Sequence, residues 1–268
     1  METKIKVHFL DNELMHATNP IRINVIGAGG TGSKVITALM ELNLSLMALD
    51  HPGIDVHLWD NDIVEQPNIA RQRFAQSEIG LPKAIALINR ANRWTGSNWK
   101  AHVLKFERDR LSGIPQHAQA SVYLSCVDNV QSRFDIADII SNVDTGYIQR
   151  DIPKYWMDFG NTKQSGQVIL STVGNIEQPT SNKFIPVNSM PFITDQYGDL
   201  LIESQETDKT PSCSVAEALE KQDLYINSTL ANMGCSLLWN LLRTGMIENR
   251  GFFVNLQNFR SQPIPVGS

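Results

Sequence analysis

The spacing of apolar residues along the first 150 positions predicts strands that alternate with helices. The β-branched run at 21–29 ends in glycine, as is typical of a buried strand in a parallel sheet. A helix is expected over 32–49, because four apolar residues recur there at helical spacing: Val35, Leu39, Leu42 and Leu46. Further strands are predicted at 54–59, 99–106 and 120–129. This alternation implies right-handed crossovers and an α/β fold with a doubly wound, mainly parallel sheet.

The segment between the second and third predicted strands has helical periodicity over 66–94. A break is expected at 79–82, where the sequence reads Ile-Gly-Leu-Pro. The sequence therefore predicts one helix before this break and another that begins near Lys83.

The pattern changes after residue 150. Residues 154–175 read as two antiparallel strands joined by a polar turn, and 175–212 is a long, weakly structured segment. Helical periodicity returns over 214–245 and ends at Gly245 in a C-cap position, and 251–259 is a plausible last strand. We expect a single domain over 1–268. Its nucleotide-binding core spans 20–150, and its extension spans 151–268 with a crossover loop at about 175–215.

Composition limits the class of protein. The formal net charge of −5 argues against a surface made for nucleic acid, and no apolar stretch is long enough to span a bilayer. The first twenty residues lack the apolar centre of a signal peptide. Three cysteines without a framework fit a reducing compartment, so we expect a cytoplasmic protein.

A glycine-rich loop follows the first strand of this Rossmann-like pattern. Gly27, Gly29 and Gly32 satisfy G-x-G-x-x-G, with Gly30 and Ser33 beside them. Glycines let phosphate oxygens approach backbone N–H groups at the positive end of a helix, and the Ser33 hydroxyl is a further candidate donor. The motif predicts phosphate binding, but it fits a redox dinucleotide and a nucleoside triphosphate equally well.

An acidic residue at the end of the second strand is expected to bind the ribose. Spacing alone favours Asp50, which lies at the end of the first helix instead. Asp60 ends the strand at 54–59, where its carboxylate can face the crevice. Asp62 is equally a ligand-site residue or a turn former.

The residues after Asp60 favour a triphosphate. Asn68, Arg71 and Gln72 are spaced to share one helical face, and Lys83 follows the glycine–proline break. Two separate cations suit the charge of a triphosphate and of the transition state of phosphoryl or adenylyl transfer. Asp128, at the end of the fourth strand, supplies a hard oxygen ligand for Mg²⁺.

These motifs together resemble the ThiF/MoeB and ubiquitin-activating enzyme superfamily over roughly residues 20–175, and the chain is also similar to the ThiF-like member of PRTRC gene cassettes. The resemblance implies that Asp60 binds the ribose hydroxyls, that Arg71 and Lys83 bind phosphates, that Asn68 and Gln72 support the site, and that Asp128 holds Mg²⁺. It implies ATP-dependent adenylation of the C-terminal carboxylate of a small ubiquitin-like or sulfur-carrier protein. It also implies a homodimer with an arginine supplied by the partner subunit. Arg22 is a poor match for that arginine.

The three cysteines have different expected roles. Cys126 and Cys235 lie in a strand and an apolar helix and are expected to pack. Cys213 lies in a polar loop before a helix, and the resemblance implies that a cysteine here accepts the activated carboxylate before a conjugating enzyme or sulfur donor acts; the alternative is a thiol without a role. Three isolated cysteines cannot form the two Cys-x-x-Cys pairs of many relatives, so no zinc site is predicted.

Two other functions remain open from the sequence. An NAD(P)-dependent oxidoreductase fits the glycine loop, although no catalytic Tyr-x-x-x-Lys or His–Asp arrangement accompanies it. The second is a non-catalytic nucleotide-binding scaffold, which would bind ATP without any turnover with a carrier.

Overall fold

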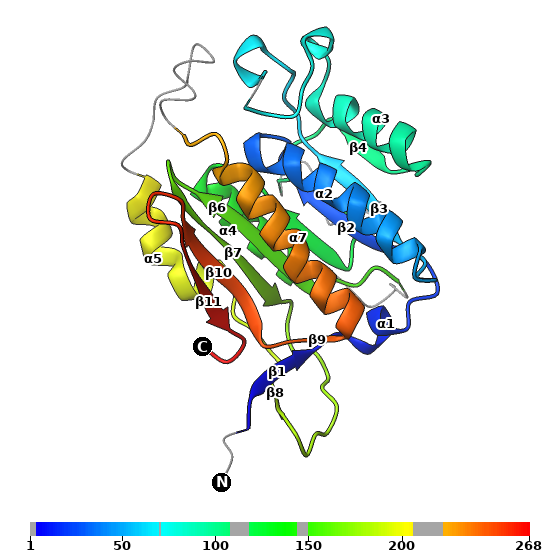
Figure 1. Cartoon of the computed structure of the whole chain (residues 1–268), viewed down its shortest axis with the longest axis vertical. Coiled ribbons are helices and arrows are strands. Elements are labelled where there is room, and N and C mark those ends of the chain that lie inside the picture. Colours follow the sequence, from blue (N-terminus) through cyan, green and yellow to red (C-terminus); the bar gives the residue numbers. More distant parts are fainter. Residues whose placement is uncertain (1–3, 70, 108–117, 144–149, 206–221) are drawn as a thin grey trace.

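The computed structural model describes residues 4–69, 71–107, 118–143, 150–205 and 222–268 (Figure 1). Within these ranges, eight strands form one sheet in the order β11-β10-β7-β6-β5-β2-β3-β4. The bounds are β2 Ile21–Ile26, β3 Ile54–Trp59, β4 Lys100–His102, β5 Val122–Ser125, β6 Tyr155–Asn161, β7 Ser165–Thr172, β10 Asn249–Asn255 and β11 Arg260–Pro265.

The sheet has a parallel half and an antiparallel half. β4, β3, β2, β5 and β6 pair in parallel, whereas β7, β10 and β11 each pair antiparallel with their neighbours. The predicted Rossmann-like, doubly wound sheet with an antiparallel extension is confirmed. The two antiparallel strands expected over 154–175 are β6 and β7, which form a hairpin.

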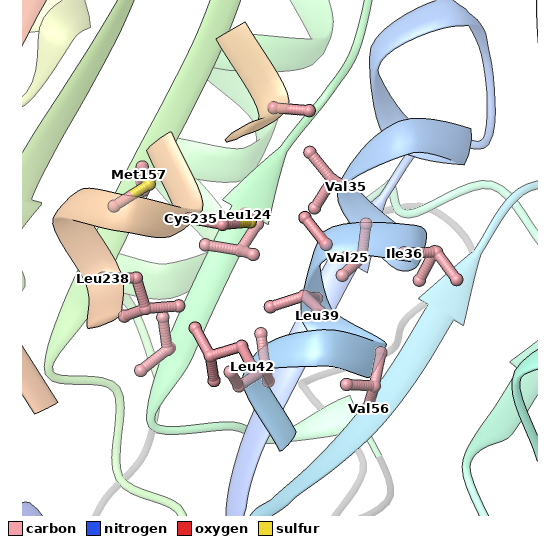
Figure 2. Packing of buried hydrophobic residues seen from close by; sticks show 14 of the residues in the cluster. Val25, Val35, Ile36, Leu39, Leu42, Val56, Leu124, Met157, Cys235 and Leu238 are labelled. Carbon is pink, nitrogen blue, oxygen red and sulfur yellow. The ribbon is translucent and has the colours of Figure 1, made fainter. Parts of the chain in front are cut away.

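Helices α2 (Gly30–Met47), α3 (Lys83–Thr95) and α7 (Ile226–Thr244) cover one face of the sheet, and α2 and α7 lie side by side across it (Figure 1). Figure 2 shows how Val35 and Leu39 of α2 meet Val25 of β2 and Leu124 of β5. The apolar stripe predicted for the first helix is buried throughout. The C-terminal helix ends as expected, since Gly245 has a φ of 72° in the left-handed region.

The opposite face is covered by α4 (Val130–Ser141) and α5 (Ile193–Gln205). Its core joins Ile136 and Ile140 of α4 to Tyr123 and Trp156 of the sheet. α5 lies inside the segment that the sequence predicts to be weakly structured, so that prediction is wrong for 193–205. No helix among the described residues is long and apolar enough to cross a membrane.

The segment expected to form a helix before the 79–82 break is not helical. It contains two single 3₁₀ turns, η1 Gln66–Asn68 and η2 Gln76–Glu78, and Ile69 between them is extended. The segment closes on itself instead, because backbone hydrogen bonds join Val64 to Leu81 and Asp62 to Lys83. This closure overrides the local helical preference.

A small sheet that the sequence does not predict ties the N-terminal segment to the fold. β1 (Lys6–Phe9) lies between β8 (Ile185–Pro186) and β9 (Met246–Ile247), and α1 (Asn12–Met15) follows it. His8 is fully buried, with Nδ1 2.6 Å from the Val187 carbonyl oxygen and Nε2 2.9 Å from the Tyr155 hydroxyl. These partners fit a neutral imidazole that donates through Nδ1 and accepts at Nε2.

Burial lowers the pKa of His8 below its usual value, against the opposing effects of the Val187 carbonyl and Asp11. The unfolded chain therefore takes up a proton near pH 6.5 while the native His8 stays neutral. We expect the free energy of unfolding to fall as the pH drops from about 6.5 through the native pKa. The His8→Gln variant should show a shallower fall in denaturant titrations between about pH 7 and 5. The same pH dependence in both proteins would contradict this assignment; His51, whose pKa burial also lowers, is common to both.

Candidate active site

A cavity of about 620 Å³ lies at the carboxyl ends of β2, β3, β5 and β6. The residues at the end of each strand form a different wall of the cavity. The glycine loop follows β2, Asp60 follows β3, the turn with Asp128 follows β5, and Asn161 ends β6. Ligands of open α/β sheets bind at this edge, where the strand order reverses. Here β3 and β5 flank β2 on opposite sides, so the chain crosses over in both directions from the glycine loop.

The glycines of the loop have different tasks. Gly27 has a φ of 95°, which favours glycine, and a Cβ on Gly32 would collide with the carbonyl oxygen of Gly27. Gly32 therefore allows α2 to pack against the turn after β2. A Cβ on Gly29 would meet nothing within 4 Å, and Gly29 lines the cavity. Gly29 and Gly30 thus form the surface that a phosphate can approach.

The first turn of α2 presents backbone donors. Within the described chain, the N–H groups of Gly30, Thr31 and Gly32 have no recorded acceptor, so they fit an anion at the positive end of the helix. The expectation that Ser33 adds a hydroxyl donor needs correction. Ser33 is fully buried; its hydroxyl donates to the Gly30 carbonyl (3.3 Å) and accepts from the Arg73 N–H (3.2 Å).

Asp60 lies at the cavity wall, as predicted, and Asp50 lies beyond the end of α2. One Asp60 carboxylate oxygen accepts from the Ala28 N–H at 2.6 Å and the other from the Asp62 N–H at 2.8 Å. Burial raises the pKa of Asp60 above its usual value, although these N–H groups and Lys83 act to lower it. Each oxygen keeps a second lone pair for a ligand hydroxyl.

The closed segment from Asp62 to Lys83 forms the next wall. Asn68, Arg71 and Gln72 all line the cavity, although they do not share a helical face. The Asn68 side-chain oxygen accepts from the Glu65 N–H at 2.8 Å, which leaves its amide nitrogen available. Arg71 Nε and Gln72 Oε1 are buried without a hydrogen-bond partner. Buried polar atoms without partners are costly, and Arg71 Nε is therefore a donor on the cavity wall with capacity for a further acceptor.

Lys83 begins α3 with its side chain 8% exposed, and its ammonium contacts the Asp62 carboxylate at 2.9 Å. Both residues line the cavity. The Asp62 side chain is 61% exposed, so this ion pair is weakly held and can exchange for a phosphate contact. The structure thus gives Asp62 a place in the site rather than only in a turn.

Asp128 lines the cavity and is exposed, with no recorded partner among the described residues. The helix cap is the following residue, since Asn129 accepts from the Ser132 N–H at 2.7 Å. Capping therefore does not occupy Asp128. A single carboxylate fits magnesium when phosphate oxygens and water complete the shell. Among the described residues, no three His, Cys, Asp or Glu side chains gather as a metal site.

A buried ion pair holds the turn that carries Asp128. Arg133 Nε contacts both carboxylate oxygens of Asp158 at 3.0 and 3.1 Å, and its guanidinium also donates to the carbonyls of Val127 and Phe159. Ser125 donates to the same carboxylate at 2.6 Å. Because one end of the turn is bound to this network, the backbone beside Asp128 is fixed.

The comparisons with known proteins agree with this geometry. A model of the ThiF family matches residues 1–265. The chain belongs to the ThiF family. No curated protein matches it significantly.

Solved structures with this fold include that of PaaA and those of E. coli MccB. PaaA has a TM-score of 0.60 at 14% identity, with 94% of this chain and 66% of PaaA covered. MccB has a TM-score of 0.58 at 13% identity, and MccB with ATP has 0.56 at 12%; each covers 94% of this chain and 66% of MccB. At these identities the likeness establishes the fold. This ThiF family member spans just under two thirds of the length of either protein.

Three hydrogen-bonded residues, Thr31, Asn161 and Asn227, are among the cavity residues of this ThiF family member that sequence analysis does not single out. Asn227, in the first turn of α7, accepts from the Thr31 hydroxyl at 2.7 Å and from the Asn161 amide at 3.1 Å. Asn227 also packs directly against Gly30. These residues lie far apart in the chain and no local motif connects them, so only the packing of α7 on α2 brings them together.

Of the other predicted residues, Cys126 lines the cavity, whereas Cys235 and Arg22 do not. Cys126 and Cys235 are buried as expected, and burial raises the thiol pKa of each, to about 12 for Cys235. Neither thiol is therefore poised as a nucleophile. Arg22 pairs with Asp55 and Asp151, both at 3.1 Å. Cys213 lies outside the described residues.

Alanine at two glycines should separate folding from ligand binding. Gly29→Ala should leave the free energy of unfolding within about 1 kcal/mol of the parent, because its Cβ enters open space. It should weaken ATP binding about tenfold or more, since that space is where phosphate oxygens approach. Gly32→Ala should cost about 1–3 kcal/mol of stability or more, because α2 must move. Thermal unfolding and calorimetric titration measure both effects, and a stable Gly32→Ala protein would contradict the assigned packing.

Proposed function

We propose that this ThiF family member uses ATP to adenylate the C-terminal carboxylate of a small protein or peptide, most specifically a ubiquitin-like or sulfur-carrier protein. One observation carries the proposal. The cavity beside the glycine loop combines the Asp60 carboxylate with two cationic side chains, Lys83 and an Arg71 whose Nε has no hydrogen-bond partner. A dinucleotide pyrophosphate is held mostly by backbone groups, whereas a triphosphate needs additional cations.

The residues around the cavity have distinct proposed tasks. Asp60 binds the ribose hydroxyls, and the glycine loop receives phosphate at the N-terminus of α2. Arg71 and Lys83 bind the phosphates and the charge that develops on them, and Asn68 and Gln72 donate around Arg71. Asp128 would hold Mg²⁺, which supplies further charge neutralisation to the leaving pyrophosphate.

The reaction needs no general base. A carboxylate oxygen of the acceptor attacks the α-phosphorus, the bond to the β-phosphate oxygen breaks, and pyrophosphate leaves with the electron pair. The nucleophile is already deprotonated, so the protein contributes alignment and charge neutralisation. An excess of cationic and amide donors over proton acceptors is what this chemistry requires.

Solved structures of MccB support the proposal by analogy. They include complexes with ATP and with MccA, one of them described as N-formylated MccA bound to the microcin C7 biosynthetic enzyme. A homodimer, a cytoplasmic location and membership of the PRTRC group remain predictions of the sequence, as does a later step with a conjugating enzyme or sulfur donor.

ATP–pyrophosphate exchange in the presence of candidate carriers that end in glycine tests the reaction. Arg71→Ala and Asp128→Asn should each lower the exchange rate at least a hundredfold, which corresponds to about 2.7–4 kcal/mol in the transition state. Arg93→Ala on the exposed side of α3 and Asp135→Asn on α4 are matched controls outside the cavity lining and should keep full exchange. Unchanged exchange in the Arg71 and Asp128 variants would refute these roles, and tight binding of NADH without ATP would refute the function.

A thioester step at Cys213 forms the finer part of the proposal. The Cys213 thiolate would attack the acyl-adenylate carbonyl, with AMP as the leaving group and a thioester as the product. Cys213→Ser should keep ATP–pyrophosphate exchange but lose the adduct that dithiothreitol cleaves on gels. An adduct that persists in this variant would exclude the role.

A further inference from the structure

Lys34 is a buried lysine in the first turn of α2, two residues after the last glycine of the loop. Its side chain is not part of the cavity lining, and the residue is 7% exposed. The Lys34 ammonium donates to the backbone carbonyl of Arg71 at 3.0 Å. No motif in the sequence singles out this lysine.

Lys34 and Ser33 hold the same short segment from two sides. The Ser33 hydroxyl accepts from the Arg73 N–H, while Lys34 binds the Arg71 carbonyl. The backbone on both sides of Gln72 is therefore attached to the first turn of α2. Because Arg71 and Gln72 line the cavity, this attachment fixes the backbone positions that carry their side chains.

The charge around this segment is not balanced. Within the described part of the chain, Lys34, Arg71 and Arg73 have no ion pair with an acidic side chain, although neighbouring cations do. Lys83 pairs with Asp62, and Arg90 pairs with Glu78. Burial lowers the pKa of Lys34, and the nearby charges of Arg73 and then Arg71 lower it further.

The three like charges repel one another, so an anion bound at Arg71, the member of the three that lines the cavity, would relieve this repulsion. Arg71 Nε is buried without a partner and Arg71 lines the cavity, so the Arg71 guanidinium has a donor left for that anion. A nucleoside triphosphate carries more negative charge than a monophosphate, and the excess lies on its terminal phosphates. The match is therefore to the triphosphate tail and to pyrophosphate.

We propose that Lys34 is a positioning residue for Arg71 and that its positive charge favours terminal phosphates bound in the cavity. This inference rests on the proposed function for its choice of ligand. It predicts that Lys34 discriminates ATP and inorganic pyrophosphate from AMP, and that it acts without touching the adenosine.

Calorimetric titration of the full chain with ATP, pyrophosphate and AMP tests this proposal. Lys34→Met should weaken ATP and pyrophosphate binding about tenfold or more and leave AMP binding within about twofold, because only the terminal phosphates lose a neighbouring charge. Lys34→Arg, which keeps the charge, should restore most of the preference for ATP over AMP. Lys154→Met is the matched control: it removes a mostly buried lysine that pairs with Asp11 away from the cavity, and it should leave both affinities unchanged.

A second substitution separates charge from hydrogen bonding. Lys34→Gln keeps a donor for the Arg71 carbonyl and removes the charge, so it should also lose preference for ATP over AMP, and it serves where Lys34→Met does not fold. An unchanged ratio of ATP affinity to AMP affinity would overturn the proposal. Equal weakening of both affinities would show that Lys34 has a structural role only. These titrations need no carrier. A chain that binds ATP through Lys34 but catalyses no exchange would therefore refute the proposed function alone.

Discussion

The close approach of the first turn of α2 to the turn after β2 is the constraint on which the site depends. Glycine at position 32 permits it, because any side chain there would collide with the Gly27 carbonyl. Once α2 is seated, its first residues contact two other segments that line the cavity. Thr31 binds Asn227 of α7, and Ser33 and Lys34 hold the backbone around Gln72. The site is thus assembled around one helix end.

Apolar and polar interactions stabilise different parts of this arrangement. Behind the glycine loop, α2 and α7 bury aliphatic side chains such as Leu39 and Leu238 against the sheet (Figure 2). Beside the cavity, the buried Arg133–Asp158 pair fixes the turn after β5. A buried pair contributes little net stability, yet the loss of one partner is costly, so its value here is the fixed geometry beside Asp128.

The sequence predicts the parts of this protein whose signals are local. The strand at β3 matches its apolar run, α2 matches its helical spacing, and Gly245 ends α7 as a glycine C-cap should. The prediction of a helix before the 79–82 break is wrong, because the backbone hydrogen bond between Val64 and Leu81 closes this segment and determines its conformation. The expected residues Asn68, Arg71 and Gln72 nevertheless line one cavity, since a closed loop brings them to the same side.

The residues that the sequence misses all act through contacts that are distant along the chain. Asn227 reaches Thr31 across 196 positions, and Lys34 reaches Arg71 across 37. β1 pairs with short strands near residues 185 and 246, and two-residue partners leave almost no pattern. Ser33 shows the converse error: its place in the glycine motif suggests a phosphate donor, but the buried hydroxyl donates to the Gly30 carbonyl and accepts from the Arg73 N–H instead.

Asp60 shows why such linked contacts matter for the chemistry. Its two oxygens fix the N–H groups of Ala28 and Asp62, so the carboxylate that we propose as the ribose ligand also shapes the glycine loop and the start of the closed segment. Asp62 in turn pairs with Lys83. Removal of the Asp60 carboxylate would therefore disturb the glycine loop and the Asp62–Lys83 pair together with the proposed ribose contact. In such a site, the ratio of a variant's affinities for two ligands can assign a role to a residue, whereas a single loss of activity cannot separate the linked contacts.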